Sequence, residues 1–533
     1  MGGFSERTCS TWIPVMTATS PHMLFIHLSL LLIALSNARE LPHGFEMLTT
    51  SPKPTTYASS KFLYSRAKSI GQQVRSRAGA RSSFPPVMSP PNPPTQNFFR
   101  ATPEQFGGDP TGSVDSTAAV QAAVAALLNH TAFSPIMASG ISNAGGATLD
   151  LAGGIYLISQ PVHIPSYIGN FHVGGGGSLL ASKSFPADKF LIEIGSLESC
   201  KPKDNQKVCN EYITVSDVFL DARHISAGGI HVAMTMGTTI TNSFMTGFKI
   251  AGILVDQGHE TMVSECWLAE YYWSETHPKE ECSSLGSGGS VGILINGEDN
   301  IVSDVIIFDF TCVGVRVNGA ANLLQGVHSW NGGGTAISIN GSYDIQDRIV
   351  DCYLDYDVLE IVQPRYVLVE NNFFYNTHTT LVPSGEQPVS WLTMKNNIYS
   401  LNQYGGNKSV VVPPGTKCQW VDIVDEIDGN QGKAGSSIVL QTRLKKSVRL
   451  NKSSKQTEYV LNFASELIFG DIDWISYTLV LVGESNATSS SDITHAAYRV
   501  NSTTVKVVVS SPVSGTIHME VAECVNSSNY EIN

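Results

Sequence analysis

The sequence predicts an all-β protein organised around a parallel β-helix, with a capping helix before the first coil and an antiparallel β domain after the last. Three observations lead to this fold class. A short strand motif recurs at a period near 22 residues, and a polar bend motif recurs between its copies. A stretch of Ala, Val and Leu at helical spacing precedes the repeats. After the repeats, polar and apolar residues alternate but the 22-residue period is absent.

The strand motif is a small residue followed by alternating apolar positions. It begins at Gly229, Gly252, Gly292, Gly314, Ala336 and Val358. The intervals are 23, 40, 22, 22 and 22 residues, and the long one equals a period plus an insertion of about 18 residues between Tyr271 and Gly289. Strand alternation turns the third residue of each motif outward. These outward residues are His231, Leu254, Leu294, Arg316, Ser338 and Glu360.

The bend motif supplies the short polar or small residues that a tight bend between strands requires. Its middle residues are Asp217, Asn242, Glu265, Asp304, Gly326, Cys352, Asn371 and Asn396. We interpret them as structural rather than catalytic. Both motifs recur with a period near 22 residues, which is the length of one coil of a parallel β-solenoid. The strands of a β-sandwich would not keep so constant a spacing. The β-helix is therefore expected over residues 97 to 413.

Both ends of the repeat carry recognisable signals. Asp115 or Ser116 is the expected N-cap of a helix that ends near Leu128 and covers the exposed first coil. Beyond Pro414, the stretch from Ala497 to Glu523 alternates polar and apolar residues between Ser/Gly turns, so residues 414 to 533 are predicted to form the separate antiparallel β domain.

The first 96 residues are predicted to lie outside the fold. The apolar stretch from Met23 to Ala38 is too short to span a bilayer and ends in small residues, which predicts a secretory signal cleaved after Ala38. A signal anchor is the alternative, and Met16 or Met23 is an alternative start. Residues 41 to 95 contain seven Lys and Arg residues but only one acidic residue, and the segment ends in a proline-rich stretch. Residues 39 to 96 are therefore expected to be a disordered tether, a pro-segment or a plain linker.

The number of cysteines and the presence of N-glycosylation acceptor motifs agree with an oxidising, extracellular compartment. Signal removal takes Cys9 and leaves eight cysteines, of which Cys200/Cys209 and Cys266/Cys282 are close enough in sequence for two bridges. Seven Asn-x-Ser/Thr motifs occur, at Asn129, Asn340, Asn407, Asn451, Asn486, Asn501 and Asn526. The formal charge is −13, and no nucleic-acid partner is expected.

The stretches from Phe106 to Val124 and from Gly145 to Pro165 resemble the opening of pectate-lyase-superfamily β-helices, the rhamnogalacturonase/epimerase-like group. The arrangement is most similar to the plant QUARTET-type polygalacturonases, over roughly residues 97 to 530. The resemblance implies a right-handed helix that degrades pectin in the cell wall. The related glycoside hydrolase family 28 uses Asn-Thr-Asp, Asp-Asp, Gly-His-Gly and Arg-Ile-Lys motifs, and none of these is present.

Polar residues cluster on the three later coils, where Asp355 and Asp357 lead into the strand of Glu360. Asp357 stands one residue before its strand, where the family 28 pattern has its second Asp, and His378 follows one coil later. Glycoside hydrolysis needs an acid and a base or nucleophile, which an inverting enzyme holds about 6.5 to 9.5 Å apart. We expect Asp355 and Asp357 to share these roles, His378 to tune them and Glu360 to substitute for either; solvated loop residues are the alternative.

An acidic protein must present local positive charge to hold galacturonan, and Arg316 and Lys395 are the expected contacts, ahead of Arg365. Before the Ser338 strand, His328, Trp330 and three glycines form "HSWNGGG", in which the indole could stack on a sugar or simply be buried. Ser338 completes the expected substrate-binding set.

We therefore predict a secreted, monomeric polygalacturonase that needs no cofactor and binds neither metal nor membrane once the signal is cleaved. No Cys/His group has zinc spacing, and the glycine run at Gly174 lacks the lysine of a phosphate loop. Two alternatives stay open. One is a lyase on the same scaffold, with an Arg or Lys base and calcium held by carboxylates, and the other is a non-catalytic pectin-binding wall protein.

Overall fold

The computed structural model describes most of the chain beyond residue 98. The described residues are 99–129, 132–133, 137, 140–201, 208–269, 290–308, 312–330, 334–340, 346–385, 387–400, 409–428, 438–482 and 493–525. The expected signal, the basic segment, the insertion between Tyr271 and Gly289, and Cys282 lie outside them.

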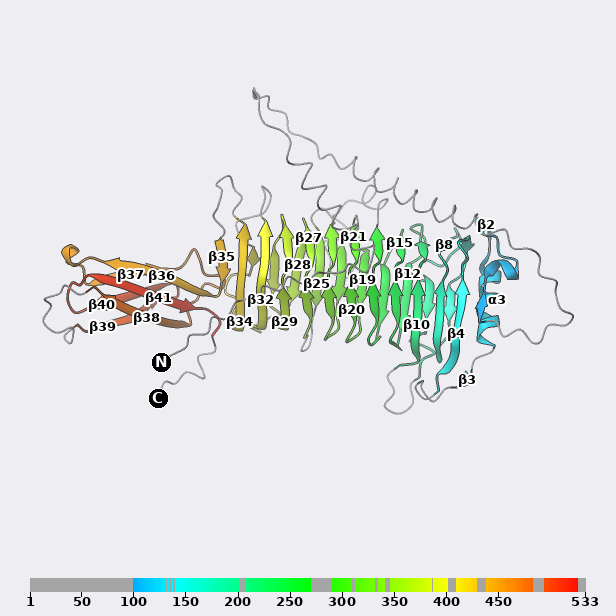
Figure 1. The fold of residues 1–533 in the computed structure, drawn as a ribbon, viewed down its shortest axis with the longest axis horizontal. Coiled ribbons are helices and arrows are strands. Elements are labelled where there is room, and N and C mark those ends of the chain that lie inside the picture. The colour runs from blue at the N-terminus through cyan, green and yellow to red at the C-terminus, as the bar shows by residue number, and fades with distance from the viewer. Residues whose placement is uncertain are drawn as a thin grey trace, which may run out of the picture. The chain divides into compact units, whose positions relative to one another are not determined.

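A ten-stranded parallel sheet contains the predicted strand motifs, one strand per coil, and its strands stack side by side (Figure 1). Its strands are β6 (Val162–Ile164), β9 (Phe190–Ile194), β12 (Gly228–Ala233), β16 (Ala251–Asp256), β19 (Val291–Ile295), β22 (Val313–Val317), β25 (Thr335–Asn340), β28 (Val358–Val362), β31 (Thr379–Val382) and β33 (Val410–Val411).

A 25-stranded sheet supplies two further strands of each coil, before and after the bend. The column before the bend comprises β1 (Arg100–Ala101), β4 (Ser142–Asp150), β7 (Ile168–Gly174), β10 (Asn210–Ser216), β13 (Thr235–Met236), β14 (Thr239–Thr241), β17 (Met262–Ser264), β20 (Ile301–Ser303), β23 (Leu323–Gln325), β26 (Arg348–Val350), β29 (Arg365–Glu370), β32 (Val389–Ser400) and β34 (Cys418–Asp428). The column after the bend comprises β2 (Thr111–Asp115), β5 (Ile155–Ile158), β8 (Ser178–Ala181), β11 (Phe219–Asp221), β15 (Phe244–Thr246), β18 (Trp267–Ala269), β21 (Ile306–Phe308), β24 (His328–Trp330), β27 (Tyr353–Asp355) and β30 (Phe373–Tyr375). Two strands pair antiparallel at its margins, β3 (Ala132–Phe133) with β4 and β35 (Ile438–Gln441) with β34.

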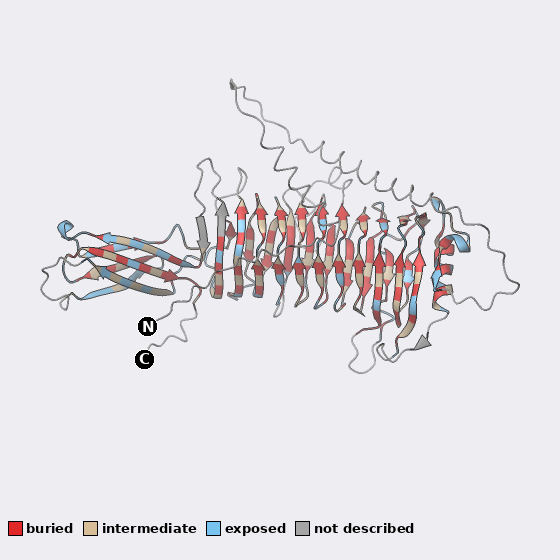
Figure 2. Ribbon diagram, in the orientation of Figure 1, coloured by how far each residue is buried: buried red, intermediate tan, exposed pale blue. Residues whose placement is uncertain are grey.

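The register confirms the predicted repeat. Leu294 pairs with Arg316, which pairs with Ser338, so the motifs lie above one another. The pairing shifts by one residue near Thr335, and Ser338 still meets Glu360. Inward residues form one continuous apolar core along both sheets, visible as the buried rows in Figure 2. Gly292 has no room for a side chain, because a Cβ there would stand 2.5 Å from the Gly314 carbonyl oxygen.

The bend motif is also confirmed, with one correction. Its residues adopt the left-handed conformation, where short polar side chains are tolerated, with φ of 57° at Asp217 and 58° at Asn371. The prediction of Cys352 as a bend residue is wrong. The bend falls on Asp351, at φ 55°, and Cys352 is buried one residue later with its thiol against the Leu324 carbonyl.

Two amide ladders, which were not predicted from the sequence, run inside the bends of the β-helix: the first lies where the chain passes from the ten-stranded sheet to the first column, and the second lies between the first and second columns. The first amide ladder is Asn300, Asn322 and Asp347, and the second is Asn372, Asn397 and Asp425. Each amide accepts from the previous coil and donates to the next, so stacked coils are linked by side chains as well as by strand pairing. Each ladder ends on an aspartate whose pKa burial raises, to about 7 at Asp347 and about 6 at Asp425.

The capping helix is confirmed as α3 (Thr117–Leu128), with Ser116 at the N-cap and a short 3₁₀ turn, η2 (Pro103–Phe106), before it. Its buried residues recur at helical spacing and all except Ala119 join the β-helix core, so one face covers the first coil. They are Ala119, Val120, Ala123, Val124 and Leu127.

Beyond β35 the described chain forms two three-stranded antiparallel sheets, which contain the alternating strands predicted near the C-terminus. The predicted boundary at residue 414 lies earlier than this, because β34 still pairs in parallel with β32 in the 25-stranded sheet. One contains β36 (Arg443–Leu450), β41 (Gly515–Ala522) and β38 (Trp474–Leu481), and the other β37 (Glu458–Asn462), β40 (Thr504–Val509) and β39 (His495–Asn501). A short 3₁₀ turn, η4 (Lys452–Ser454), joins β36 to β37.

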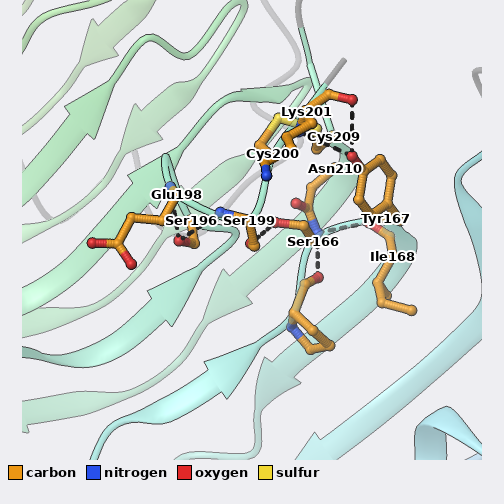
Figure 3. The surroundings of a disulfide bond; sticks show 11 residues. Ser166, Tyr167, Ile168, Ser196, Glu198, Ser199, Cys200, Lys201, Cys209 and Asn210 are labelled. Atoms are coloured by element: carbon orange, nitrogen blue, oxygen red, sulfur yellow. Dashed lines mark hydrogen bonds between the residues drawn. A yellow bond between two sulfur atoms is a disulfide. The ribbon is translucent and has the colours of Figure 1, made fainter. Parts of the chain in front are cut away.

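The disulfides agree with one of the two expected bridges. Cys200 and Cys209 are bonded, and the surrounding loop is held further by Tyr167, whose hydroxyl binds the backbone of Lys201 (Figure 3). The Cys266–Cys282 expectation is wrong, because Cys266 is a free, buried thiol. A Cys418–Cys524 bond, 106 residues apart in sequence, connects β34 to the chain after β41.

Candidate functional site

Three polar side chains lie in one row on the outward face of the ten-stranded sheet. Arg316 on β22 pairs with Ser338 on β25, which pairs with Glu360 on β28. Their neighbours Val315, Val317 and Ile361 are fully buried, so strand alternation turns the row away from the core. Neighbouring strands lie about 4.8 Å apart, so the row spans about 10 Å between its end Cα atoms. We call Arg316, Ser338 and Glu360 the outer row.

Hydrogen bonding and charge couple the members of the outer row. The Ser338 hydroxyl donates to Glu360 Oε2 at 3.1 Å. Burial lowers the pKa of the Arg316 guanidinium, and the charge of Glu360 acts in the opposite direction. The Arg316 Nε is buried without a hydrogen-bond partner. A partly desolvated guanidinium with a vacant donor is well suited to bind a carboxylate ligand.

Asp355 lies at the end of β27, between two aromatic residues in register with it, Trp330 on β24 and Tyr375 on β30. The carboxyl is half-buried, and its Oδ1 has no hydrogen-bond partner. Burial raises the pKa of Asp355 to about 6. A carboxyl group that keeps its proton in mildly acidic solution can act as a general acid.

A two-residue bend brings the chain from Asp355 on one sheet to the Glu360 strand on the other. Tyr356 occupies the left-handed region at φ 64°, and its ring packs edge-on against that of Tyr375, with 5.5 Å between centroids. This short corner leaves only four residues between Asp355 and Glu360 in sequence.

Asp357 is fully buried at the same corner. Its carboxylate accepts hydrogen bonds from the backbone N–H of Gly334 at 3.0 Å and the Ser329 hydroxyl at 3.4 Å. Its backbone carbonyl accepts from the Thr377 hydroxyl at 2.5 Å. Asp357 therefore fixes the chain on three successive coils.

The two candidate histidines are placed on neighbouring parts of this corner. His328 lies on β24 with its ring 4.8 Å from that of Tyr353, and His378 directly precedes β31 and accepts from the Leu359 N–H through its backbone carbonyl. Burial lowers the pKa of both imidazoles. Both are therefore expected to be neutral at pH 7.

Lys395 is not brought together with the outer row. It lies on β32 in the 25-stranded sheet, and its ammonium is 3.0 Å from Asp422 Oδ2. A paired ammonium on another sheet is less available to a ligand on the ten-stranded sheet.

Two features of the site were missed from the sequence. Tyr375, beside Asp355, lies 20 residues after it, close to one period, which was the available signal. A second polar group comprises Glu193, in register with His231, whose Nε2 is 4.0 Å from Asp256 Oδ2. Glu193 escaped notice because its strand begins with Phe190 instead of a small residue.

Within the described ranges, no group of three or more His, Cys, Asp and Glu is arranged to hold a metal ion. None of the helices in that part of the chain has the length and apolar character needed to cross a bilayer.

Comparison with known proteins identifies a relative over most of the chain. No family model matches. The polygalacturonase QRT3 of Arabidopsis thaliana is 32% identical over 454 residues, covering 83% of this chain and 88% of that protein. Among solved structures, ORF18 of Geobacillus virus E2 aligns with a TM-score of 0.49 and 14% identity over 78% of this chain and 77% of its own. The tailspike of E. coli bacteriophage HK620, in complex with a pentasaccharide, aligns with a TM-score of 0.42 and 10% identity over 80% and 94%.

Proposed function

Because the chain belongs to the family of the Arabidopsis polygalacturonase QRT3, we propose that it hydrolyses the α-1,4-galacturonosyl links of pectin. The identity over 83% of the chain is the observation that carries this proposal. The outer row and Asp355 support it, because they supply two carboxyl groups and a cation on one corner of the β-helix, and a uronan hydrolase needs all three.

We assign the chemistry to the solvent-accessible carboxyl groups. Asp355, with its raised pKa, is the general acid, and Glu360 is the base. Asp357 has no exposed surface, so we assign it a positioning role: it holds the corner that carries both groups. Arg316 binds a uronate carboxylate, and Trp330 provides a surface for a sugar ring. The neutral His378 and His328 border the corner.

The reaction follows from these roles. Asp355 donates its proton to the glycosidic oxygen as the bond from that oxygen to the anomeric carbon breaks. Glu360 takes a proton from a water molecule, whose oxygen forms the new bond to the opposite face of the anomeric carbon. The product is inverted, and the proton on Glu360 returns to Asp355 through solvent. Ser338 donates to Glu360 and keeps its carboxylate turned toward the row.

We further propose that the protein is secreted to the cell wall after cleavage following Ala38. The described disulfides, Cys200–Cys209 and Cys418–Cys524, support an oxidising compartment. N-terminal sequencing of the protein recovered from culture medium tests this, since a mature chain beginning at Arg39 is the expected result.

Incubation with polygalacturonate tests the activity. Hydrolysis releases reducing ends without an unsaturated product. Ultraviolet absorbance from an unsaturated uronate would instead identify a lyase, and tight retention without any fall in viscosity would identify a pectin-binding protein. Either of the last two results would overturn the proposed reaction.

A further inference from the structure

Three aromatic residues form an exposed stack on the last coils of the β-helix. Tyr366 on β29, Trp391 on β32 and Trp420 on β34 belong to neighbouring strands (Figure 1). The Tyr366 and Trp391 rings stack at 5.2 Å and 19°, and the Trp391 and Trp420 rings at 5.3 Å and 22°. Tyr366 is 41% exposed and Trp391 44%. We call these three residues the aromatic strip.

The backbone of the aromatic strip is in a costly conformation. All three residues are left-handed, with φ of 58°, 55° and 58°. This region is uncommon for bulky residues and costs on the order of 1 to 2 kcal/mol each. Glycine or asparagine would fit there with less strain, as Asn371 and Asn396 do in the bends. Two of these large rings are also exposed to solvent, so they gain little from burial that would offset the strain. This indicates a role for the rings at the surface.

The surroundings of the aromatic strip match an acidic sugar polymer. One residue before each ring, Arg365, Ser390 and Gln419 form a parallel row in register. Arg365 and Lys417 are exposed cations. The acid Asp422, further along β34, is already paired with Lys395. Positive charge and hydrogen-bonding groups beside aromatic surface suit the carboxylates, hydroxyls and C–H faces of uronate sugars.

The aromatic strip also continues from the proposed catalytic coil. Only Gln363 and Pro364 separate β28, which carries Glu360, from β29, which begins at Arg365. The next two coils carry Trp391 and Trp420. A polymer that passes Glu360 and follows the stack toward its last coils would therefore run beside the strip.

From this placement we propose that the aromatic strip is a binding site for the galacturonan chain outside the bond-cleaving corner. Arg365 and Lys417 pair with uronate carboxylates. Stacking covers the ring faces between neighbours, so sugar contacts fall on the outer face of Tyr366 and on the hydrogen-bonding edges of the two indoles. The proposal rests on the proposed function for the identity of the polymer.

Binding to polygalacturonate by a variant that cannot cleave it tests this inference. In a Glu360→Gln background, affinity electrophoresis should show that Trp391→Asn weakens the apparent Kd about tenfold, as expected for loss of an aromatic anchor. Asparagine tolerates the left-handed backbone, so Tm should not fall. Tyr212→Asn is the matched control, because Tyr212 is left-handed and 59% exposed on an early coil, and its affinity should not change.

The outcomes separate this inference from the proposed reaction. Unchanged affinity in Trp391→Asn, with or without a lower Tm, overturns the strip as a binding site even if the wild-type protein hydrolyses pectin. An equal loss in Tyr212→Asn, or no binding by the parent variant, also overturns it. A selective loss in Trp391→Asn supports the strip even if the wild-type protein releases no reducing ends.

Discussion

The first amide ladder and the outer row are two polar stacks on overlapping coils of the β-helix, and they differ in how their nitrogen donors are partnered. Inside the bend, the Asn322 side chain accepts from the Asn300 backbone and amide and donates toward Asp347. On the outward face, Ser338 donates to Glu360 but the Arg316 Nε has no partner.

We relate this difference to two roles of the same architecture, stability for the ladder and the proposed chemistry for the outer row. Stacked coils place equivalent residues in register, whether they face inward or outward. Inward amides are fully buried and bond to the neighbouring coil, where an unpaired group would cost stability. On the outward face, the Arg316 guanidinium keeps an unused donor at Nε. We therefore expect ladder substitutions to change stability and outer-row substitutions to change activity.

The largest expected effect is on catalysis at the outer row. Glu360→Gln should lower kcat for polygalacturonate by about 10² to 10⁴, the usual contribution of a general base. Thermal unfolding should change little, because Glu360 is half-buried and its neighbour Ser338 keeps an amide partner. Reducing-end assays check the expected loss of kcat, and a Tm measurement checks that stability is unchanged. A folded Glu360→Gln protein with full activity would remove this residue from the mechanism.

Loss of the acid should come next in size. Asp355→Asn should reduce kcat about a hundredfold at pH 5. Since the pKa of Asp355 is raised to about 6, the protonated acid is depleted above that pH, and wild-type kcat/KM should fall as pH rises through 6. In the Asp355→Asn variant, kcat/KM should not show this fall on the alkaline side of the pH profile. A pH profile of both proteins is the measurement, and an identical fall in Asp355→Asn would assign the titration to another group.

Breaking the first amide ladder should destabilise the fold. Asn322→Leu leaves the Asn300 N–H and amide unpaired in the interior, at a cost of about 2 to 3 kcal/mol. Asn318→Leu is the matched control, because Asn318 is exposed on the same coil and pairs only with Asn296; its cost should be about 0.5 kcal/mol or less. Denaturant unfolding compares the two. If the two variants lost the same free energy of unfolding, burial would not explain the contribution of the amide ladder to stability.

The smallest effect expected is on substrate binding. Arg316→Gln should raise KM for polygalacturonate about tenfold by removing a charge-assisted pair with a uronate carboxylate. The change in kcat should be smaller. Steady-state kinetics on methyl-esterified pectin provides the contrast, because a neutral ester gains little from the guanidinium. The same KM change on both polymers would argue against a carboxylate contact.

Periodicity made most of the β-helix predictable, since it places His231, Leu254, Leu294, Arg316, Ser338 and Glu360 in one row without any long-range information. It failed where alternation is locally ambiguous. Ile349 and Val350 are both apolar, so the bend was set one residue late at Cys352. A one-residue slip reverses inward and outward faces.

Other features depend on contacts that sequence spacing does not encode. Cys266 faces the core and bonds to backbone carbonyls, so its nearness to Cys282 in sequence was misleading. The Cys418–Cys524 bond joins segments 106 residues apart. At the candidate site, Asp355 and Asp357 looked equivalent in sequence, and the structure distinguishes them by burial, since Asp357 is fully buried and Asp355 is half-buried.

The central claim is that galacturonan is bound and cleaved along the outer row. A crystal structure of the Glu360→Gln variant with an oligogalacturonide tests it most directly. We predict a uronate carboxylate at the Arg316 guanidinium and a glycosidic oxygen within hydrogen-bond reach of Asp355. An oligosaccharide bound elsewhere, with Arg316 and Asp355 untouched, would contradict the account.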